Sequence, residues 1–223
     1  MSQQLTLGIR LRDDATFDNY YVSQNEQVVH NLQEQNEPYV FLFGENGAGK
    51  SHLLQAACHE IGKKGLPVVY LPLAEDGLMP AMFDGLENMS LIALDDIQEI
   101  IGDDEWEYAL FNLYNRVREK GVSMLVSSSQ PLASLKIKLA DLKSRLSWGP
   151  TFQLHGLSDK EKTQALQQRA KNRGLILADE VVTYLLKRSP RDMSSLFALF
   201  EKLDKASMVE KRKLTIPFIK DYL

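Results

Sequence analysis

A glycine-rich segment in the first quarter of the chain carries the residue types that bind phosphate groups. It reads GENGAGKS, and Gly44, Gly47, Gly49, Lys50 and Ser51 fit the spacing G-x-x-x-x-G-K-[ST]. Glycines allow turns with positive φ and let backbone N–H groups face an anion. The lysine contacts the terminal phosphates of a nucleotide, and the serine hydroxyl holds Mg²⁺. The segment therefore predicts a nucleotide site, with binding residues Gly44, Asn46, Gly47, Ala48, Gly49, Lys50, Ser51 and His52.

Two carboxylates follow a second apolar stretch, in LIALDDIQEI. Four apolar residues deliver Asp95 and Asp96 to the carboxyl edge of the expected sheet, where ligands of α/β proteins bind. We expect Asp95 to orient Mg²⁺ through a water molecule, with Ser51 as the second metal-binding residue. Asp96 stands where a catalytic base, or a carboxylate that polarises the attacking water, belongs. A strand that ends in two aspartates is by itself equally compatible with a solvated turn, so this assignment depends on the phosphate loop.

Strand patterns alternate with helical patterns in the part of the chain that surrounds these residues. Apolar stretches rich in β-branched or aromatic residues predict strands, and those in the middle show no alternation, as expected for parallel strands covered on both faces. The pattern predicts an α/β domain with a mostly parallel sheet. The expected strands are 39–43, 68–71, 91–94, 124–127 and 151–154, and the expected helices are 51–62, 105–119 and 132–146.

After Gly156 the pattern becomes helical. Ser158 and Glu161 form a capping box at the start of LSDKEKTQALQQRAKNRG, and Gly174 is a suitable C-terminal stop. Three further helices are expected at 179–188, at 192–207 and from 217 to the end. The chain is thus expected to comprise an arm (1–12), an α/β nucleotide-binding domain (13–155) and a small all-helical lid domain (156–223).

Composition excludes several classes of protein. The chain has 223 residues and a formal net charge of −4, so no global field draws it to DNA or to an anionic membrane. Its single cysteine, Cys58, cannot form an internal disulfide, which fits a reducing cytoplasm. We expect no secretory signal and no membrane-spanning segment. The four histidines lack the spacing of zinc ligands.

The phosphate loop, LDDIQ, the strand after it, DLKSRL and a helical lid together resemble the AAA+ ATPases of the DnaA initiator clade. The resemblance implies a P-loop AAA+ domain followed by a helical lid. It also implies that TFDNYYVSQNEQVVHNL lines an adenine pocket through Tyr21, Val22 and Asn25, and that Arg145 is an arginine finger that reaches a nucleotide on a neighbouring subunit. Judged without the family, Arg145 would instead complement the dipole of its helix and pair with Asp141.

Two departures from the clade bear on the nucleotide. The clade often has an acidic residue where Ser129 stands, and the lid position that should carry a phosphate-gripping arginine is aligned with Ser194. Arg191, or alternatively Arg188, would have to replace that arginine. Losing these contacts weakens the sensing of a γ-phosphate more than the binding of a diphosphate. We therefore expect ADP or another nucleoside diphosphate as a bound ligand, with ATP as an alternative, optional Mg²⁺ and weak ATPase activity of the chain itself.

The N-terminus opens with apolar residues at alternate positions, which predicts either an edge strand or an extended peptide that binds in a groove of another protein. The resemblance favours the second interpretation, because QLTLGI is similar to a peptide with which members of the clade hold the DNA polymerase sliding clamp. The expected clamp-binding residues are Gln4, Leu5, Leu7 and Ile9.

The resemblance also implies a function in the negative control of replication initiation. Tethered to the sliding clamp, the protein would present Arg145 to ATP held by the DnaA initiator and accelerate hydrolysis in trans. The expected partners are the clamp, the initiator and a second copy of the chain, with DNA contacted only indirectly and no membrane. Two alternatives remain open: an ATP-driven loader of the replicative helicase, and a scaffold that binds the clamp without catalysis.

Overall fold

The computed structural model describes residues 11–190 and 192–222, with the side chain of Ser194 left out. These residues divide into two compact units. One unit comprises Lys50–His155 together with the chain up to Glu45, and the other comprises Asn46–Gly49 and the chain from Gly156 onward. Each unit is described by itself below.

The first unit is built on a five-stranded sheet in the order β2-β3-β4-β1-β5, and every pair of neighbouring strands is parallel. β3 and β1 are almost wholly buried because helices cover both of their faces, which explains their uninterrupted apolar sequences. The strands are β1 (Tyr39–Phe43), β2 (Val68–Pro72), β3 (Leu91–Asp95), β4 (Ser123–Ser128) and β5 (Thr151–Gln153).

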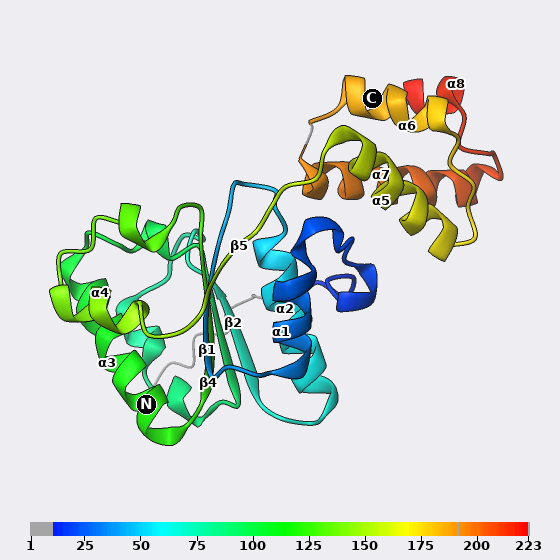
Figure 1. The fold of residues 1–223 in the computed structure, drawn as a ribbon. Helices are drawn as coiled ribbons and strands as arrows, with labels where there is room; N and C mark the ends of the chain where they lie inside the picture. The colour runs from blue at the N-terminus through cyan, green and yellow to red at the C-terminus, as the bar shows by residue number, and fades with distance from the viewer. Residues whose placement is uncertain (1–10, 191, 223) are drawn as a thin grey trace. The chain divides into compact units, whose positions relative to one another are not determined.

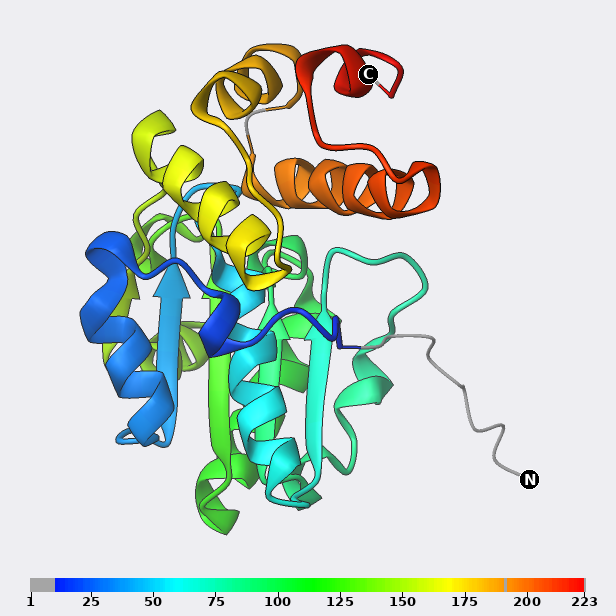
Figure 2. The same cartoon turned by 90° about the vertical axis from the view of Figure 1, so that its right-hand side faces the viewer.

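Helices lie on both faces of this sheet (Figure 1). α1 (Glu26–Glu34) and α2 (Lys50–Lys63) cover one face, and α3 (Asp104–Lys120) and α4 (Ala140–Leu146) cover the other. Figure 2 looks onto the first of these faces, with α1 in blue and α2 in cyan in front of the strands. Short 3₁₀ turns occupy Phe17–Asn19, Ser23–Asn25, Pro80–Phe83, Leu86–Asn88, Ile97–Glu99 and Leu132–Ser134.

The second unit contains four helices that share one apolar core. Leu166, Val182, Phe200 and Phe218, one from each helix, are fully buried. The expected capping box at Ser158 is present, with both reciprocal hydrogen bonds. The helices are α5 (Asp159–Asn172), α6 (Asp179–Arg188), α7 (Met193–Glu210) and α8 (Ile216–Lys220).

The five expected strands are confirmed to within one or two residues at each end, but the helix expected over 132–146 is wrong in its first half. Leu132–Ser134 forms only a 3₁₀ turn, and α4 begins at Ala140. The backbone N–H groups of Lys138 and Leu139 donate instead to the buried carboxylate of Glu107, at 2.8–3.2 Å. A side chain far away in the sequence therefore takes the donors that an earlier helical turn would need.

Candidate functional site

The glycine-rich loop joins β1 to α2, and its glycines are required for two different reasons. Gly47 and Gly49 have φ values of 83° and 98°, in the left-handed region that residues with a Cβ atom rarely adopt. Gly44 is constrained by its surroundings instead, because a Cβ atom there would lie 2.5 Å from the carbonyl oxygen of Leu154. The loop thus ends β1 against the segment after β5 and then turns so that α2 begins at Lys50.

Lys50 is buried, and its hydrogen-bond acceptors among the described residues are carbonyl groups. Its side chain is 5 % exposed, and its Nζ donates to the carbonyl oxygens of Gly44 at 2.8 Å and Glu45 at 3.2 Å. No carboxylate of the described residues lies within ion-pair distance of it. A buried ammonium without a counter-charge is costly, and an anionic ligand removes that cost. The surroundings of Lys50 therefore fit a phosphate group.

The two expected carboxylates lie at the end of β3 in different environments. Asp95 is 2 % exposed, and each of its oxygens accepts a hydrogen bond. Ser127 Oγ donates to Oδ1, and the Tyr70 hydroxyl donates to Oδ2 at 2.7 Å. Asp96 has a φ of 59°, and its backbone N–H donates to Ser127 Oγ at 2.9 Å. Ser127 therefore connects both acids to β4.

Gln98 links the second acid to the end of β4. Its Nε2 donates to Asp96 Oδ1 at 3.0 Å, and its Oε1 accepts from the backbone N–H of Ser129 at 3.0 Å. Sequence reasoning missed Tyr70, Ser127 and Gln98. A hydroxyl or amide group becomes recognisable as a partner of the acids only when the strand order brings β2, β3 and β4 together.

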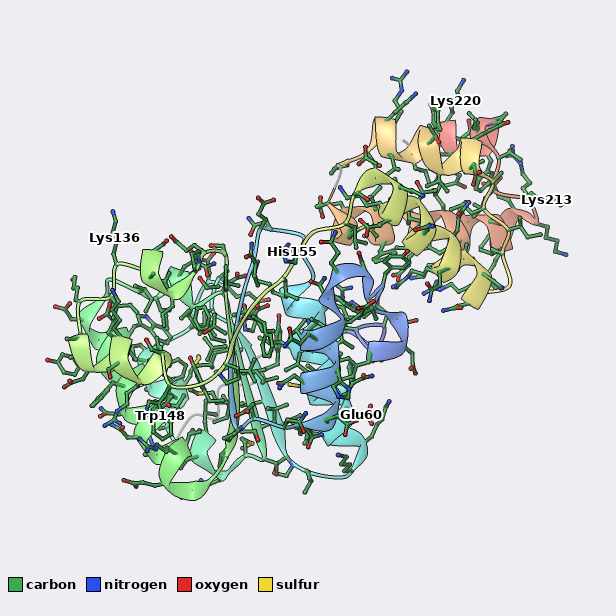
Figure 3. All side chains as sticks on the ribbon, viewed as in Figure 1. Glu60, Lys136, Trp148, His155, Lys213 and Lys220 are labelled. Carbon is green, nitrogen blue, oxygen red and sulfur yellow. The ribbon has the colours of Figure 1, made fainter. Side chains whose placement is uncertain are left out.

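Asn25, expected in the adenine pocket, is 3 % exposed and fully engaged by the chain itself. Its Nδ2 donates to the Tyr20 hydroxyl at 3.0 Å and to the carbonyl of His155 at 3.1 Å, and its Oδ1 accepts from the His155 N–H at 2.9 Å. Asn25 thus joins the N-terminal segment to the segment after β5 that carries His155, and Figure 3 labels His155. It can shape a wall of a pocket but has no amide hydrogen left for a base.

The other residues expected near the base, Tyr21 and Val22, lie close in sequence to Asn25, and His52, expected in the nucleotide site, lies at the start of α2. Tyr21 and Val22 are half-buried and immediately precede the 3₁₀ turn at Ser23–Asn25. His52 lies in the first turn of α2, where its Nε2 is 2.8 Å from the carbonyl oxygen of Thr16. The ring of His52 also packs on Tyr20, with the ring centroids 5.4 Å apart. The segment before α1 is therefore attached to the helix that follows the phosphate loop.

Arg145 lies in the last turn of α4 and is half-buried. Among the described residues it forms no ion pair, and the alternative pairing with Asp141 is not present. Burial raises the pKa of Tyr114, and the positive charges of Arg118 and Arg145 partly offset this rise. Trp148, two residues after this helix and labelled in Figure 3, is 64 % exposed. The guanidinium carbon of Arg118 lies 3.7 Å from the centroid of its ring.

Several expected residues fall outside the description. The expected clamp-binding residues and Arg191 are not among the described residues, and nothing is described of the Ser194 side chain. Arg188 lies over the ring of Tyr184, 6.0 Å from its centroid.

No described helix is long and apolar enough to cross a membrane. Within the same part of the chain, no group of three His, Cys, Asp or Glu side chains could hold a metal ion. The expected site residues that lie outside the described part of the chain are Gln4, Leu5, Leu7, Ile9 and Arg191.

A parallel sheet with a glycine-rich loop after its first strand and paired acids after its third defines an α/β protein of the P-loop type. Residues 11–153 match the model of the bacterial DnaA ATPase domain, and residues 159–223 match the model described as the Hda lid domain. The first match spans well over half of the chain, which therefore belongs to the bacterial DnaA ATPase domain family. It is an AAA+ protein with a helical lid, related to proteins of replication initiation.

Solved structures share this fold at low sequence identity. Domain III of the Thermotoga maritima replication initiation protein DnaA is 19 % identical, with a TM-score of 0.77, over 95 % of this chain and 96 % of that one. AMPPCP-bound DnaA from Aquifex aeolicus is 21 % identical, with a TM-score of 0.72, over 88 % and 66 %. A Thermotoga maritima RuvB variant is 18 % identical, with a TM-score of 0.60, over 90 % and 66 %. These likenesses concern the fold.

Proposed function

We propose that this chain is a nucleotide-bound regulator of the DnaA initiator, of the kind called Hda, that stimulates the initiator's ATP hydrolysis in trans. The observation that carries the proposal is that Arg145, on an AAA+ domain of the initiator's own family, forms no ion pair with any residue that the structure describes. A cation that forms no ion pair within the described chain is suited to a negatively charged ligand outside it. The match of residues 159–223 to the Hda lid model supports the same proposal.

The first part of the proposal is a nucleoside diphosphate at the phosphate loop. Lys50 would contact the β-phosphate, while the backbone of Gly47 and Gly49 would face the phosphate oxygens. Support comes from the buried, uncompensated charge of Lys50 and from the AMPPCP bound by a DnaA of the same fold. Mg²⁺, where present, would be held by Ser51 and, through water, by Asp95.

Mass spectrometry of the nucleotide that copurifies with the native protein tests this part. We expect a diphosphate in the native protein and its loss in Lys50→Ala. Lys63→Ala, at the exposed end of the same helix, is the matched control and should retain the nucleotide. A native protein that copurifies without nucleotide and binds none when it is added would contradict the proposal.

The second part is the role of Arg145. An arginine finger contributes ~10³- to 10⁵-fold to hydrolysis, because it stabilises the charge that develops on the transferring phosphoryl group. In a single-turnover assay with initiator-bound ATP, Arg145→Ala should therefore lose on the order of 10³-fold or all measurable stimulation. Lys143→Ala, exposed on the same helix, is the matched control and should stimulate normally.

The same assay separates the alternatives. Equal stimulation by Arg145→Ala and native protein would reject the catalytic role and favour a scaffold. Rapid ATP turnover by the isolated chain, with no effect on the initiator, would favour a helicase-loader type of ATPase.

The third part is attachment to the DNA polymerase sliding clamp through the N-terminal peptide. The peptide Gln4–Ile9 would place Gln4 as an anchoring amide and the apolar residues in pockets of the clamp. The double variant Gln4→Ala plus Leu7→Ala should abolish clamp binding, measured by surface plasmon resonance. Thr6→Ala, at an intervening position, should bind as the native chain does. Unchanged affinity of the double variant would contradict this part.

A further inference from the structure

Hydroxyl groups of the chain already occupy the carboxylate of Asp95. Ser127 Oγ donates to one oxygen and the Tyr70 hydroxyl to the other, at 2.7 Å for the tyrosine. Both donors approach a group that is 2 % exposed. Hydrogen bonds to a buried carboxylate are strong because they are assisted by its charge. Any further partner of Asp95 must share the carboxylate with these two hydroxyls or displace one of them.

The register of the sheet explains how Tyr70 reaches the acid. β2 and β3 are parallel, with Tyr70 opposite Ala93 and Pro72 opposite Asp95. Residues two apart along a strand share a face, so Tyr70 and Asp95 are diagonal neighbours on one side of the sheet. That side carries α2, whose Ser51 and Gln55 are one helical turn apart.

The Tyr70 hydroxyl lies between the strand and this helix. Burial, followed by the charge and hydrogen bond of Asp95, raises the pKa of Tyr70 well above its ordinary value. Hydrogen bonding with the nearby side chains of Gln55 and Ser51 lowers the same pKa, though by less. The geometry makes this hydroxyl a donor, because the carboxylate oxygen 2.7 Å away is an acceptor. It lies among the side chains, Asp95 and Ser51, that are the expected partners of Mg²⁺.

We propose that Tyr70 competes with Mg²⁺ for Asp95, so that the site holds a nucleoside diphosphate with little dependence on the metal. This inference rests on the proposed nucleotide binding and adds a specific residue to it. A water molecule bound to Mg²⁺ must donate a hydrogen bond to a carboxylate oxygen of Asp95. The Tyr70 hydroxyl already donates to one of these two oxygens. The phosphate contacts of Lys50 and of the loop backbone need no such acceptor. Phosphate binding and metal binding are thereby separated within one site.

The variant Tyr70→Phe tests the proposal, because it keeps the buried ring and removes only the hydroxyl. A fluorescent ADP analogue reports binding to the full-length chain, first in EDTA and then during titration with Mg²⁺. In EDTA the variant and the native protein should bind the analogue equally. The Mg²⁺ concentration at half-maximal response should fall about tenfold in the variant, because one charge-assisted competitor for Asp95 is gone. Tyr108→Phe, an exposed tyrosine on α3, is the matched control and should titrate as the native protein does.

The outcomes separate this inference from the proposed function. Binding of the analogue with identical Mg²⁺ midpoints in native protein and Tyr70→Phe overturns the competition and leaves the nucleotide site intact. A higher midpoint in the variant also overturns it, because Tyr70 would then help to hold the metal. A native protein that fails to bind the analogue with or without Mg²⁺ overturns both proposals. If Tyr70→Phe does not fold, Tyr70→Leu, which likewise lacks a hydrogen-bond donor, provides a second variant, and an unchanged midpoint in that variant overturns the competition.

Discussion

Gly44 and Gly47 stand three residues apart in the same loop, yet different physical constraints require glycine at each. Gly47 needs its positive φ of 83°, which is a property of its own backbone. Gly44 needs the absence of a Cβ atom, because the carbonyl oxygen of Leu154 would lie 2.5 Å away from it. A motif residue that reads as part of phosphate binding thus also maintains the contact between β1 and the segment after β5.

We expect Gly44→Ala to destabilise the first unit by about 1–3 kcal/mol, as overpacking against a fixed backbone atom does. Gly62→Ala is the matched control, since Gly62 lies within α2 and a Cβ there would meet only Val68 at an ordinary 4.0 Å. The control should stabilise by about 0.5–1 kcal/mol, because alanine favours a helix interior. Denaturant unfolding measures both changes. If Gly44→Ala were as stable as the native protein, the backbone at Leu154 would have to move away from residue 44 without a measurable loss of stability, which would contradict this prediction.

Cys58 illustrates a reactive residue type made inert by its position. It is fully buried on α2, and burial raises the pKa of its thiol to about 12. The thiolate is the reactive form, so the native protein should not react with a thiol reagent such as DTNB. The same protein in guanidinium should react fully, while Cys58→Ala should not react in either condition. Rapid labelling of the native chain would contradict this prediction.

Glu107 connects three elements and thereby positions α4, the helix that carries Arg145. The carboxylate is 1 % exposed and lies in the first turns of α3. It accepts hydrogen bonds from the backbone N–H groups of Gly102, Lys138 and Leu139. Because Leu139 is the N-cap residue of α4, the glutamate determines where that helix begins.

We expect Glu107→Ala to lower the free energy of unfolding by about 1–3 kcal/mol, because it leaves three partly buried backbone donors without their acceptor. The control is Lys138→Ala, which removes the exposed ion pair with Asp104 but keeps the backbone N–H. An exposed pair contributes little, so the control should change stability by less than about 1 kcal/mol. Chemical denaturation compares the two variants. Equal effects would show that α4 is positioned by packing alone.

At the scale of the molecule, the two units differ in how they should respond to nucleotide. Lys50, Asp95 and Asp96 belong to the first unit, whereas α5–α8 have their own apolar core. A ligand that binds only the folded state stabilises it by RT ln(1 + [L]/Kd), where [L] is the concentration of free ligand. Nucleotide should therefore raise the unfolding temperature of the AAA+ domain.

With ADP at about 100 times its dissociation constant, the stabilisation is roughly 2.7 kcal/mol, which corresponds to roughly 5–10 °C for a chain of this size. Differential scanning calorimetry should show this increase in the native protein and none in Lys50→Ala. Adding adenosine, which lacks phosphates, should leave both proteins unchanged. An equal increase in Lys50→Ala would mean that the ligand binds elsewhere.

Much of the fold could be predicted because its signals are local. The phosphate loop is one continuous segment, the strands are uninterrupted apolar stretches, and the capping box at Ser158 involves residues three apart. Each of these features depends on interactions within a few residues along the chain, which the order of residue types records directly. The one clear error, the helix expected before Ala140, arose where a distant carboxylate claimed the local donors.

The sequence by itself determined the class of the domain and the position of its phosphate loop, because both follow from short-range periodicity and spacing. Only the tertiary structure decided how the acids are held. The Tyr70–Asp95 bond joins residues 25 apart, and the Ser127–Asp95 bond joins residues 32 apart. Such pairs meet because the order and register of parallel strands bring them onto one face, and no local pattern encodes that register.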